Sequence, residues 1–134
     1  MSNWIDNIVW DEDGLLPVIV QDSISKRVVM FAWMNRISLE QSLAHKKAVY
    51  WSRSRNKLWV KGEESGNYQL IEDIHLDCDY DVLLLTIRQE GGISCHTGRE
   101  GCFFNRINMH TNEIEINDKV IRDPNDMYEK KNDK

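Results

Sequence analysis

Two runs of strand-forming residues near the N-terminus constrain the fold most strongly. They lie in "LPVIVQDSISKRVVMFAWMN", residues 16–35, and each is rich in β-branched and aromatic side chains. A polar stretch from Asp22 to Lys26 separates them. Strand-forming runs joined by a short polar turn are typical of antiparallel pairing, so the sequence predicts a hairpin here.

The same pattern returns twice along the chain. "AVYWSRSRNKLWVKG", residues 48–62, predicts two short strands around a basic turn. The run from Tyr68 to Gln89 is too long for one strand, because strands average about 5 to 6 residues. Its cluster of turn-forming residues, Asp77 to Asp81, predicts a hairpin tip. "SLEQSLAHKK", residues 38–47, predicts a short helix with Ser38 as N-cap and Gln41 completing a capping box.

These elements predict an α+β fold: a mixed, mostly antiparallel β-sheet built from hairpins, with one or two short helices. The chain has 134 residues, of which 41% are hydrophobic, so we expect one domain with a core that needs no disulfides. Residues 118–134 are charged and poor in large apolar groups. We expect them to form a flexible tail.

Composition excludes several kinds of partner. The net charge of -5 argues against binding to nucleic acid, which requires a basic face. No apolar run approaches the roughly 18 to 20 residues that cross a bilayer, and the acidic N-terminus does not look like a signal peptide. We therefore expect a cytoplasmic protein with no nucleic-acid or membrane partner. An odd number of cysteines, 3, leaves metal binding or free thiols.

The cysteines concentrate in one region. Cys95 and Cys102 lie in the glycine-rich, polar segment "GGISCHTGREGCFF", and Cys78 lies upstream in "HLDCDYDVLLL". Three thiolate ligands leave the fourth position of zinc open, as in catalytic sites. Buried apolar thiols are the alternative. His96, next to Cys95, is a candidate for proton transfer at such a site.

Acidic residues alternate around Cys78. Asp77, Asp79 and Asp81 repel one another at neutral pH, and a hard dication bound through oxygen relieves that repulsion. The triplet therefore suggests Mg²⁺. A solvated acidic turn is the alternative, because the glycine and distal glutamate of an EF-hand loop are absent.

One stretch is locally basic and rich in hydroxyl groups. Its members are the basic residues Arg53, Arg55, Lys57 and Lys61, interleaved with Ser52, Ser54, Ser65 and Gly66. They offer the bidentate arginines and loop N–H groups that bind phosphate. An exposed charged hairpin explains the same composition equally well.

Three segments together resemble a known family. "WSRSRNKLWVKGEESGN", "LDCDYD" and "CHTGREGCF", in that order, resemble the signature of phosphoribosyl-AMP cyclohydrolase, over about residues 14–104. The resemblance implies a domain over residues 1–117 and a homodimer with zinc at its interface. Cysteines from both chains hold that zinc, a role that falls here on Cys78, Cys95 and Cys102. Mg²⁺ binds at the position of the aspartate triplet.

The resemblance also implies an activity. The family are hydrolases acting on a cyclic amidine in histidine biosynthesis: a zinc-activated water opens the purine ring of 1-(5-phosphoribosyl)-AMP at the N1–C6 bond. The product is a phosphoribosyl-formimino-aminoimidazole carboxamide ribotide. His96 is expected to move the proton. The phosphates or ribose of this small-molecule substrate are expected to contact six residues: Arg53, Arg55, Lys57, Ser65, Gly66 and Asn67.

Two positions depart from the family pattern: Tyr80 stands where a small turn residue such as glycine is frequent, and Val60 where many members carry histidine. We expect a monofunctional protein, because few residues follow Phe104.

The signature of zinc nucleoside deaminases is absent. Two rival functions stay open: a non-enzymatic zinc-stabilised binding module, which predicts a closed four-ligand site, and a redox pair formed by Cys95 and Cys102.

Overall fold

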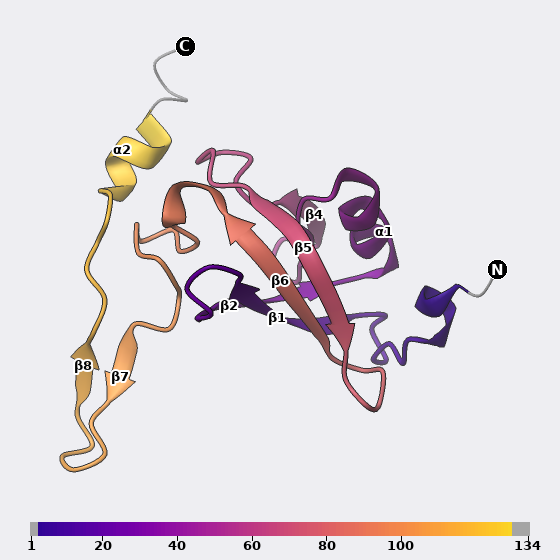
Figure 1. Ribbon diagram of the computed structural model, residues 1–134, viewed down its shortest axis with the longest axis horizontal. Coiled ribbons are helices and arrows are strands. Elements are labelled where there is room, and N and C mark those ends of the chain that lie inside the picture. Colours follow the sequence, from indigo (N-terminus) through magenta and orange to yellow (C-terminus); the bar gives the residue numbers. More distant parts are fainter. Residues whose placement is uncertain (1–2, 130–134) are drawn as a thin grey trace.

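The fold is built around a four-stranded sheet. A computed structural model describes residues 3–129. Its sheet has the strand order β2-β1-β6-β5, with β1 at Leu16–Asp22, β2 at Val28–Met34, β5 at Gln69–Leu76 and β6 at Leu83–Gln89. The β1–β2 and β5–β6 pairs are antiparallel hairpins, and a parallel β1–β6 contact joins them. This arrangement confirms the predicted α+β class and the two hairpins (Figure 1).

Two further hairpins complete the strands. β3 spans Val49–Ser52 and pairs with β4 at Lys57–Val60, as predicted. β7, Asn105–Ile107, pairs with β8, Ile114–Ile116, a hairpin that the sequence did not predict. β7 and β8 extend away from the four-stranded sheet (Figure 1).

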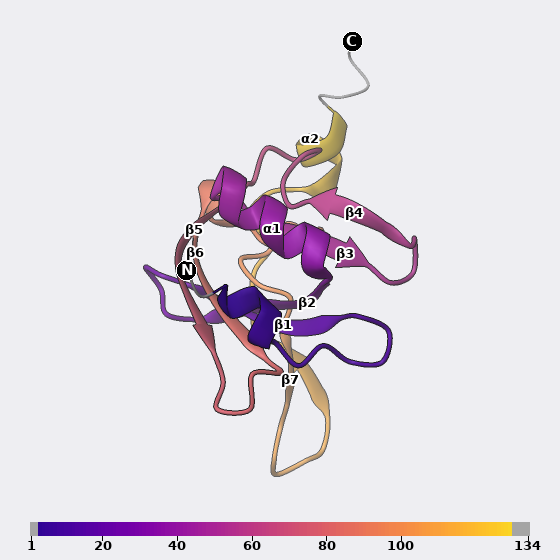
Figure 2. The ribbon, with the colours of Figure 1, turned by 90° about the vertical axis from the view of Figure 1, so that its right-hand side faces the viewer.

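The core lies on one face of the sheet. In β1, buried and half-buried residues alternate, because successive side chains of a strand point to opposite faces. Val18 and Val20 are fully buried there and meet Leu83 and Leu85 of the parallel neighbour β6. The helix α1, Arg36–His45, adds Leu39 to this cluster, and Figure 2 shows α1 lying beside β3 and β4.

The predicted helix exists, but its predicted cap is wrong. Asn35, not Ser38, is the N-cap: its side chain accepts a hydrogen bond from Ser38 N at 2.8 Å. Ser38 Oγ in turn accepts from Asn35 N at 2.9 Å. The helix begins three residues earlier than expected because Asn35 follows directly on β2 in an extended conformation, so Ser38 takes the place that Gln41 was expected to fill.

Three further helical segments of the described chain are short. The 3₁₀ turn η1 spans Trp4–Asn7, η2 spans Glu90–Gly92 after β6, and the helix α2 spans Pro124–Glu129. Of the tail expected over 118–134, the last five residues lie outside the described part. The domain boundary after residue 117 and the flexibility of the tail stay predictions. No helix within residues 3–129 is long and apolar enough to cross a bilayer.

Candidate active site and metal centres

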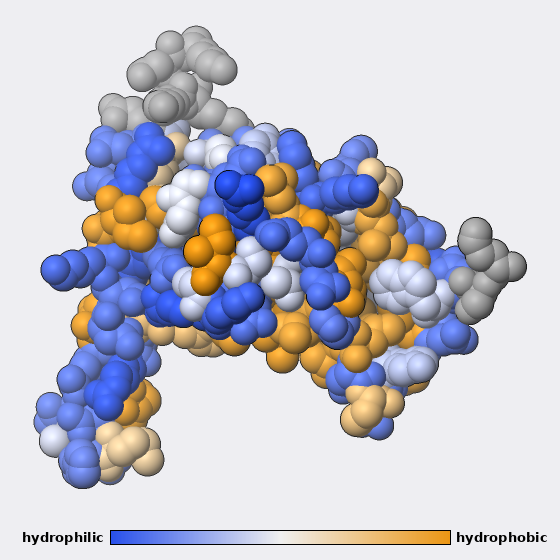
Figure 3. Space-filling view, in the orientation of Figure 1, coloured by the Kyte–Doolittle hydropathy of each residue, from blue (hydrophilic) through white to orange (hydrophobic). Residues whose placement is uncertain are grey.

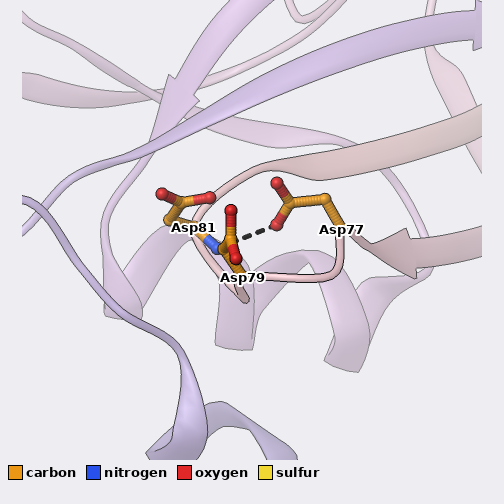
Figure 4. A group of neighbouring side chains, drawn as sticks. All are labelled: Asp77, Asp79 and Asp81. Carbon is orange, nitrogen blue, oxygen red and sulfur yellow. Dashed lines mark hydrogen bonds between the residues drawn. The ribbon is translucent and has the colours of Figure 1, made fainter.

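The aspartate triplet occupies the turn between β5 and β6. One carboxylate oxygen from each of Asp77, Asp79 and Asp81 lies within 4.8 Å of the other two, and Figure 4 shows the three side chains around one turn. Asp77 Oδ1 accepts hydrogen bonds from Asp81 N at 3.0 Å and Val82 N at 3.2 Å. The backbone of the turn therefore fixes one carboxylate and leaves oxygens of all three close together.

The carboxylates of this turn titrate differently. For Asp77, slight desolvation is outweighed by the backbone N–H groups of Asp81 and Val82, so its pKa is lowered. For Asp81, desolvation and the nearby Asp77 carboxylate raise the pKa. The nearby negative charges thus oppose ionisation of all the carboxylates in the turn. A bound divalent cation would instead favour their ionised forms.

Cys95 and Cys102 meet at the base of a glycine-rich loop. Cys95 is buried, and its backbone N–H donates to Arg99 O at 3.2 Å. Cys102 N donates to Val29 O at 2.7 Å, which anchors the end of the loop on β2. Desolvation and the neighbouring Cys95 raise the pKa of the Cys102 thiol to about 12. Two soft donors therefore share one site.

Cys78 lies far from the other two thiols. It is exposed in the aspartate turn that precedes β6, whereas Cys95 and Cys102 follow the opposite end of β6. A strand of 7 residues is about 20 Å long. Within residues 3–129, the aspartate triplet is the one group of three or more potential metal ligands with atoms that close together. One chain therefore does not gather its three thiols around one ion.

The chain after residue 117 packs on the cysteine loop. Ile121 N and Arg122 N donate to Gly98 O at 2.8 and 3.3 Å, and Arg99 Nε donates to Asp118 O at 3.0 Å. Arg27 forms ion pairs with Glu100 and, at 2.7 Å, with Asp118. These contacts tie the loop to Arg27, directly before β2, and to the C-terminal segment, and none of them was predicted from the sequence.

Lys61, a member of the basic stretch identified in the sequence, lies beside the cysteine loop. Its Nζ donates to Ser94 O, next to Cys95. Burial lowers the pKa of Lys61, and the Cys102 and Cys95 thiols oppose that shift. A cation thus lies beside the thiol pair. The sequence grouped Lys61 with the basic residues that could bind phosphate, and its contact with the thiol loop was not predicted.

The loop of Ser65, Gly66 and Asn67 lies beside the end of β6. Asn67 is buried, and its backbone O accepts from Gln89 Nε2 at 2.8 Å. Ser65 Oγ accepts from Asn67 N at 3.2 Å. Among the described residues, Asn67 Nδ2 is the buried side-chain polar atom that has no hydrogen-bond partner. Its N–H donors are therefore unsatisfied within the described part of the chain.

The structure separates the other predicted substrate residues from that loop. Arg53, Arg55 and Lys57 are exposed at the turn between β3 and β4, whereas Lys61 and the 65–67 loop follow the far end of β4. Arg53 lies over the Trp33 ring at 4.3 Å and lines an open cleft of about 380 Å³. His96 is exposed next to buried Cys95.

Comparison with known proteins agrees with these motifs. Residues 30–104 match the family model described as Phosphoribosyl-AMP cyclohydrolase, a range that holds all the residues expected in the site. A phosphoribosyl-AMP cyclohydrolase of Nitrosomonas eutropha is 54% identical over 127 residues, covering 95% of this chain and 97% of its own. One from Cellvibrio japonicus is 50% identical over 128 residues, covering 96% of this chain and 100% of its own. The chain therefore belongs to the phosphoribosyl-AMP cyclohydrolase family.

Proposed function

We propose that this protein hydrolyses 1-(5-phosphoribosyl)-AMP at the N1–C6 bond, a step of histidine biosynthesis in the cytoplasm. The observation that carries the proposal is the family match over residues 30–104, which includes the thiols, the aspartate triplet and both loops. In the reaction the oxygen of water forms a bond to C6, the N1–C6 bond breaks, and a proton is delivered to N1. The carboxamide and the formamidine are then separate groups.

Zinc fits the thiols only if two copies of the chain share it. Cys95 and Cys102 would supply two thiolates and the Cys78 of a second copy the third, because Cys78 lies at the opposite end of β6 in its own chain. Zn²⁺ with three thiolates and an open position supplies activation of water as a nucleophile. Lys61, which donates to Ser94 O, would offset part of the negative charge of these thiolates.

Magnesium fits the aspartate turn. Three carboxylate oxygens within 4.8 Å match the preference of Mg²⁺ for hard oxygen ligands, whereas the thiols suit zinc. Cys78 lies between two of these aspartates in the sequence. The shared site would therefore hold the two metals close together.

His96 would move the proton, because it is exposed directly beside Cys95. The substrate would be held by Arg53, Arg55, Lys57 and the loop of Ser65, Gly66 and Asn67. The free Nδ2 donor of Asn67 supports the loop as a contact, since a buried donor without a partner costs about 1–3 kcal/mol. The basic turn would provide positive charge for phosphate.

Incubation of the purified protein with phosphoribosyl-AMP tests the activity. The expected result is loss of the absorbance spectrum of the intact purine, with zinc present in the active protein. Absence of any spectral change with metal-loaded, folded protein would rule the activity out.

Mixing two inactive variants tests the shared zinc site. Cys78→Ser and Cys95→Ser chains each lack one ligand, but a mixed dimer holds one intact set of three thiols. We expect the unfolded and refolded mixture to regain about a quarter of the wild-type activity and zinc, since half of the dimers are mixed and each has one intact site. Two variants that stay inactive after mixing would place all three ligands in one chain.

A further inference from the structure

The β7–β8 hairpin has one apolar face. Ile107 lies opposite Ile114, and Ile116 lies two residues beyond Ile114 on the same face. These side chains are 49%, 66% and 63% exposed. The other face carries Arg106 and Glu115, which form an ion pair at 3.5 Å. The hairpin is thus amphipathic, and residues 3–129 leave its apolar face open to solvent. Figure 3 shows hydrophobic and hydrophilic surface beside each other on this projecting hairpin.

The turn of this hairpin is nevertheless closely defined. Asn108 N donates to Glu113 O at 2.9 Å, and Asn112 N donates to Asn108 O at 2.8 Å. Asn108 Oδ1 also accepts from His110 N at 2.8 Å. A two-stranded hairpin alone is marginally stable in water. A ribbon with a fixed turn and an uncovered apolar face therefore needs a surface to pack on.

The hairpin starts where a second copy must approach. β7 begins three residues after Cys102, and Asn117 N donates to Phe104 O at 3.0 Å to close its base. A second copy that brings its Cys78 to Cys95 and Cys102 also brings the residues around that turn. Tyr80 is 47% exposed there, and Val9, which donates to Tyr80 O at 2.8 Å, is 58% exposed.

We propose that the apolar face of Ile107, Ile114 and Ile116 packs on a second copy of this chain, next to the shared thiol site. The inference rests on the proposed function, because that site is what brings the second copy to the base of the hairpin. In a two-fold symmetric dimer each chain extends one such arm across its partner. The hairpin then acts as a clamp that keeps Cys78 in reach of the other chain's cysteines.

A matched pair of variants tests the arm. The face variant combines Ile107→Thr, Ile114→Thr and Ile116→Thr, which keep β-branched side chains in the strands. The control combines Arg106→Thr and Glu115→Thr on the opposite face. Sedimentation velocity over a concentration series gives the dimer dissociation constant, metal analysis gives zinc per chain, and far-ultraviolet circular dichroism checks the fold.

We expect the face variant to raise the dimer dissociation constant by about 100-fold or more, since buried apolar anchors dominate interfaces, and to lose zinc at concentrations where it is monomeric. The control should keep the wild-type constant. An unchanged constant in the face variant, or a wild type that is monomeric throughout, overturns the arm. If the arm is confirmed but wild-type protein neither holds zinc nor opens the ring, the proposed function fails on its own.

Hydrogen exchange of the wild type tests the arm without any substitution, so the test stands even if the face variant misfolds. The amides of β7 and β8 should be protected in the dimer and lose protection when dilution dissociates it. Protection that does not change with dissociation overturns the arm. Protection of a monomer only after a different protein is added would assign the face to that partner and overturn the inference as well.

Discussion

At the scale of single residues, Gly98 is the position where the cysteine loop tolerates least change. Its φ is +85°, and a Cβ added there would lie 1.8 Å from Arg122 O. Both the left-handed backbone and the contact with the C-terminal segment therefore require glycine. The loop that carries Cys95 keeps its shape only while residue 98 has no side chain.

We expect Gly98→Ala to lower the free energy of unfolding by about 2–4 kcal/mol, because it adds a steric clash to the cost of a strained φ. Zinc content and ring opening should fall with it. Thermal denaturation and metal analysis measure both. Gly14→Ala is the control: φ is +75° there but nothing lies within 4 Å, so it isolates the backbone cost. Equal losses in the two variants would contradict the clash.

Tyr80 illustrates the opposite case. Its φ is 62°, a conformation that costs an L-residue roughly 1–2 kcal/mol and that glycine adopts without strain. We expect Tyr80→Gly to raise the free energy of unfolding by up to about 1 kcal/mol. The relief of backbone strain is partly offset, because glycine has more conformational entropy than tyrosine in the unfolded chain. Urea denaturation measures the change. A loss of stability would mean that the half-exposed ring makes contacts worth more than the strain.

At the scale of elements, the capping box of α1 gives a further prediction. Asn35 Oδ1 accepts from Ser38 N at 2.8 Å, so Asn35→Ala leaves that N–H without its partner. We expect a loss of about 1 kcal/mol in the free energy of unfolding. Gln41→Ala is the control and should change stability by less than about 0.5 kcal/mol. A larger effect at Gln41 would restore the cap inferred from the sequence.

The elements also show what a sequence can and cannot predict. The hairpins of β1–β2 and β5–β6 were predicted because long strand-forming runs flank polar turns, and together they form the four-stranded sheet. β7 and β8 have three residues each and bury none of them, so their alternation of apolar and polar residues is too short to stand out in the sequence. The hydrogen bonds of Ile121 and Arg122 with Gly98 join backbone atoms far apart in the sequence, and composition does not predict such contacts.

The same limit applies to the candidate site. The aspartate triplet was found because its members alternate within one turn, where local sequence sets geometry. The division of the cysteines between the two ends of β6 depends on the course of the chain between residues 78 and 95. Residue type suggested zinc, the family resemblance suggested a shared site, and only the fold shows that Cys78 lies away from Cys95 and Cys102.

At the scale of the whole molecule, removal of metal should separate function from folding. The core cluster consists of apolar residues of the sheet, α1 and their neighbours, and it does not include the three cysteines. We expect chelation or Cys95→Ser to abolish ring opening while circular dichroism keeps most of its native signal. Unfolding upon chelation would support the zinc-stabilised binding module, because structural zinc supplies folding energy. A reversible Cys95–Cys102 disulfide without zinc would support the redox pair.

The parallel pairing of β1 with β6 affects how the chain folds during its synthesis. Residues 18–22 pair with residues 83–87, so about 60 residues separate the two partners. At a synthesis rate of about 5–20 residues per second, the first hairpin leaves the ribosome seconds before the strand that pairs with the free edge of β1. During that interval the unpaired edge of β1 is open to chance pairing with other chains, which makes the nascent chain a natural client for a holding chaperone.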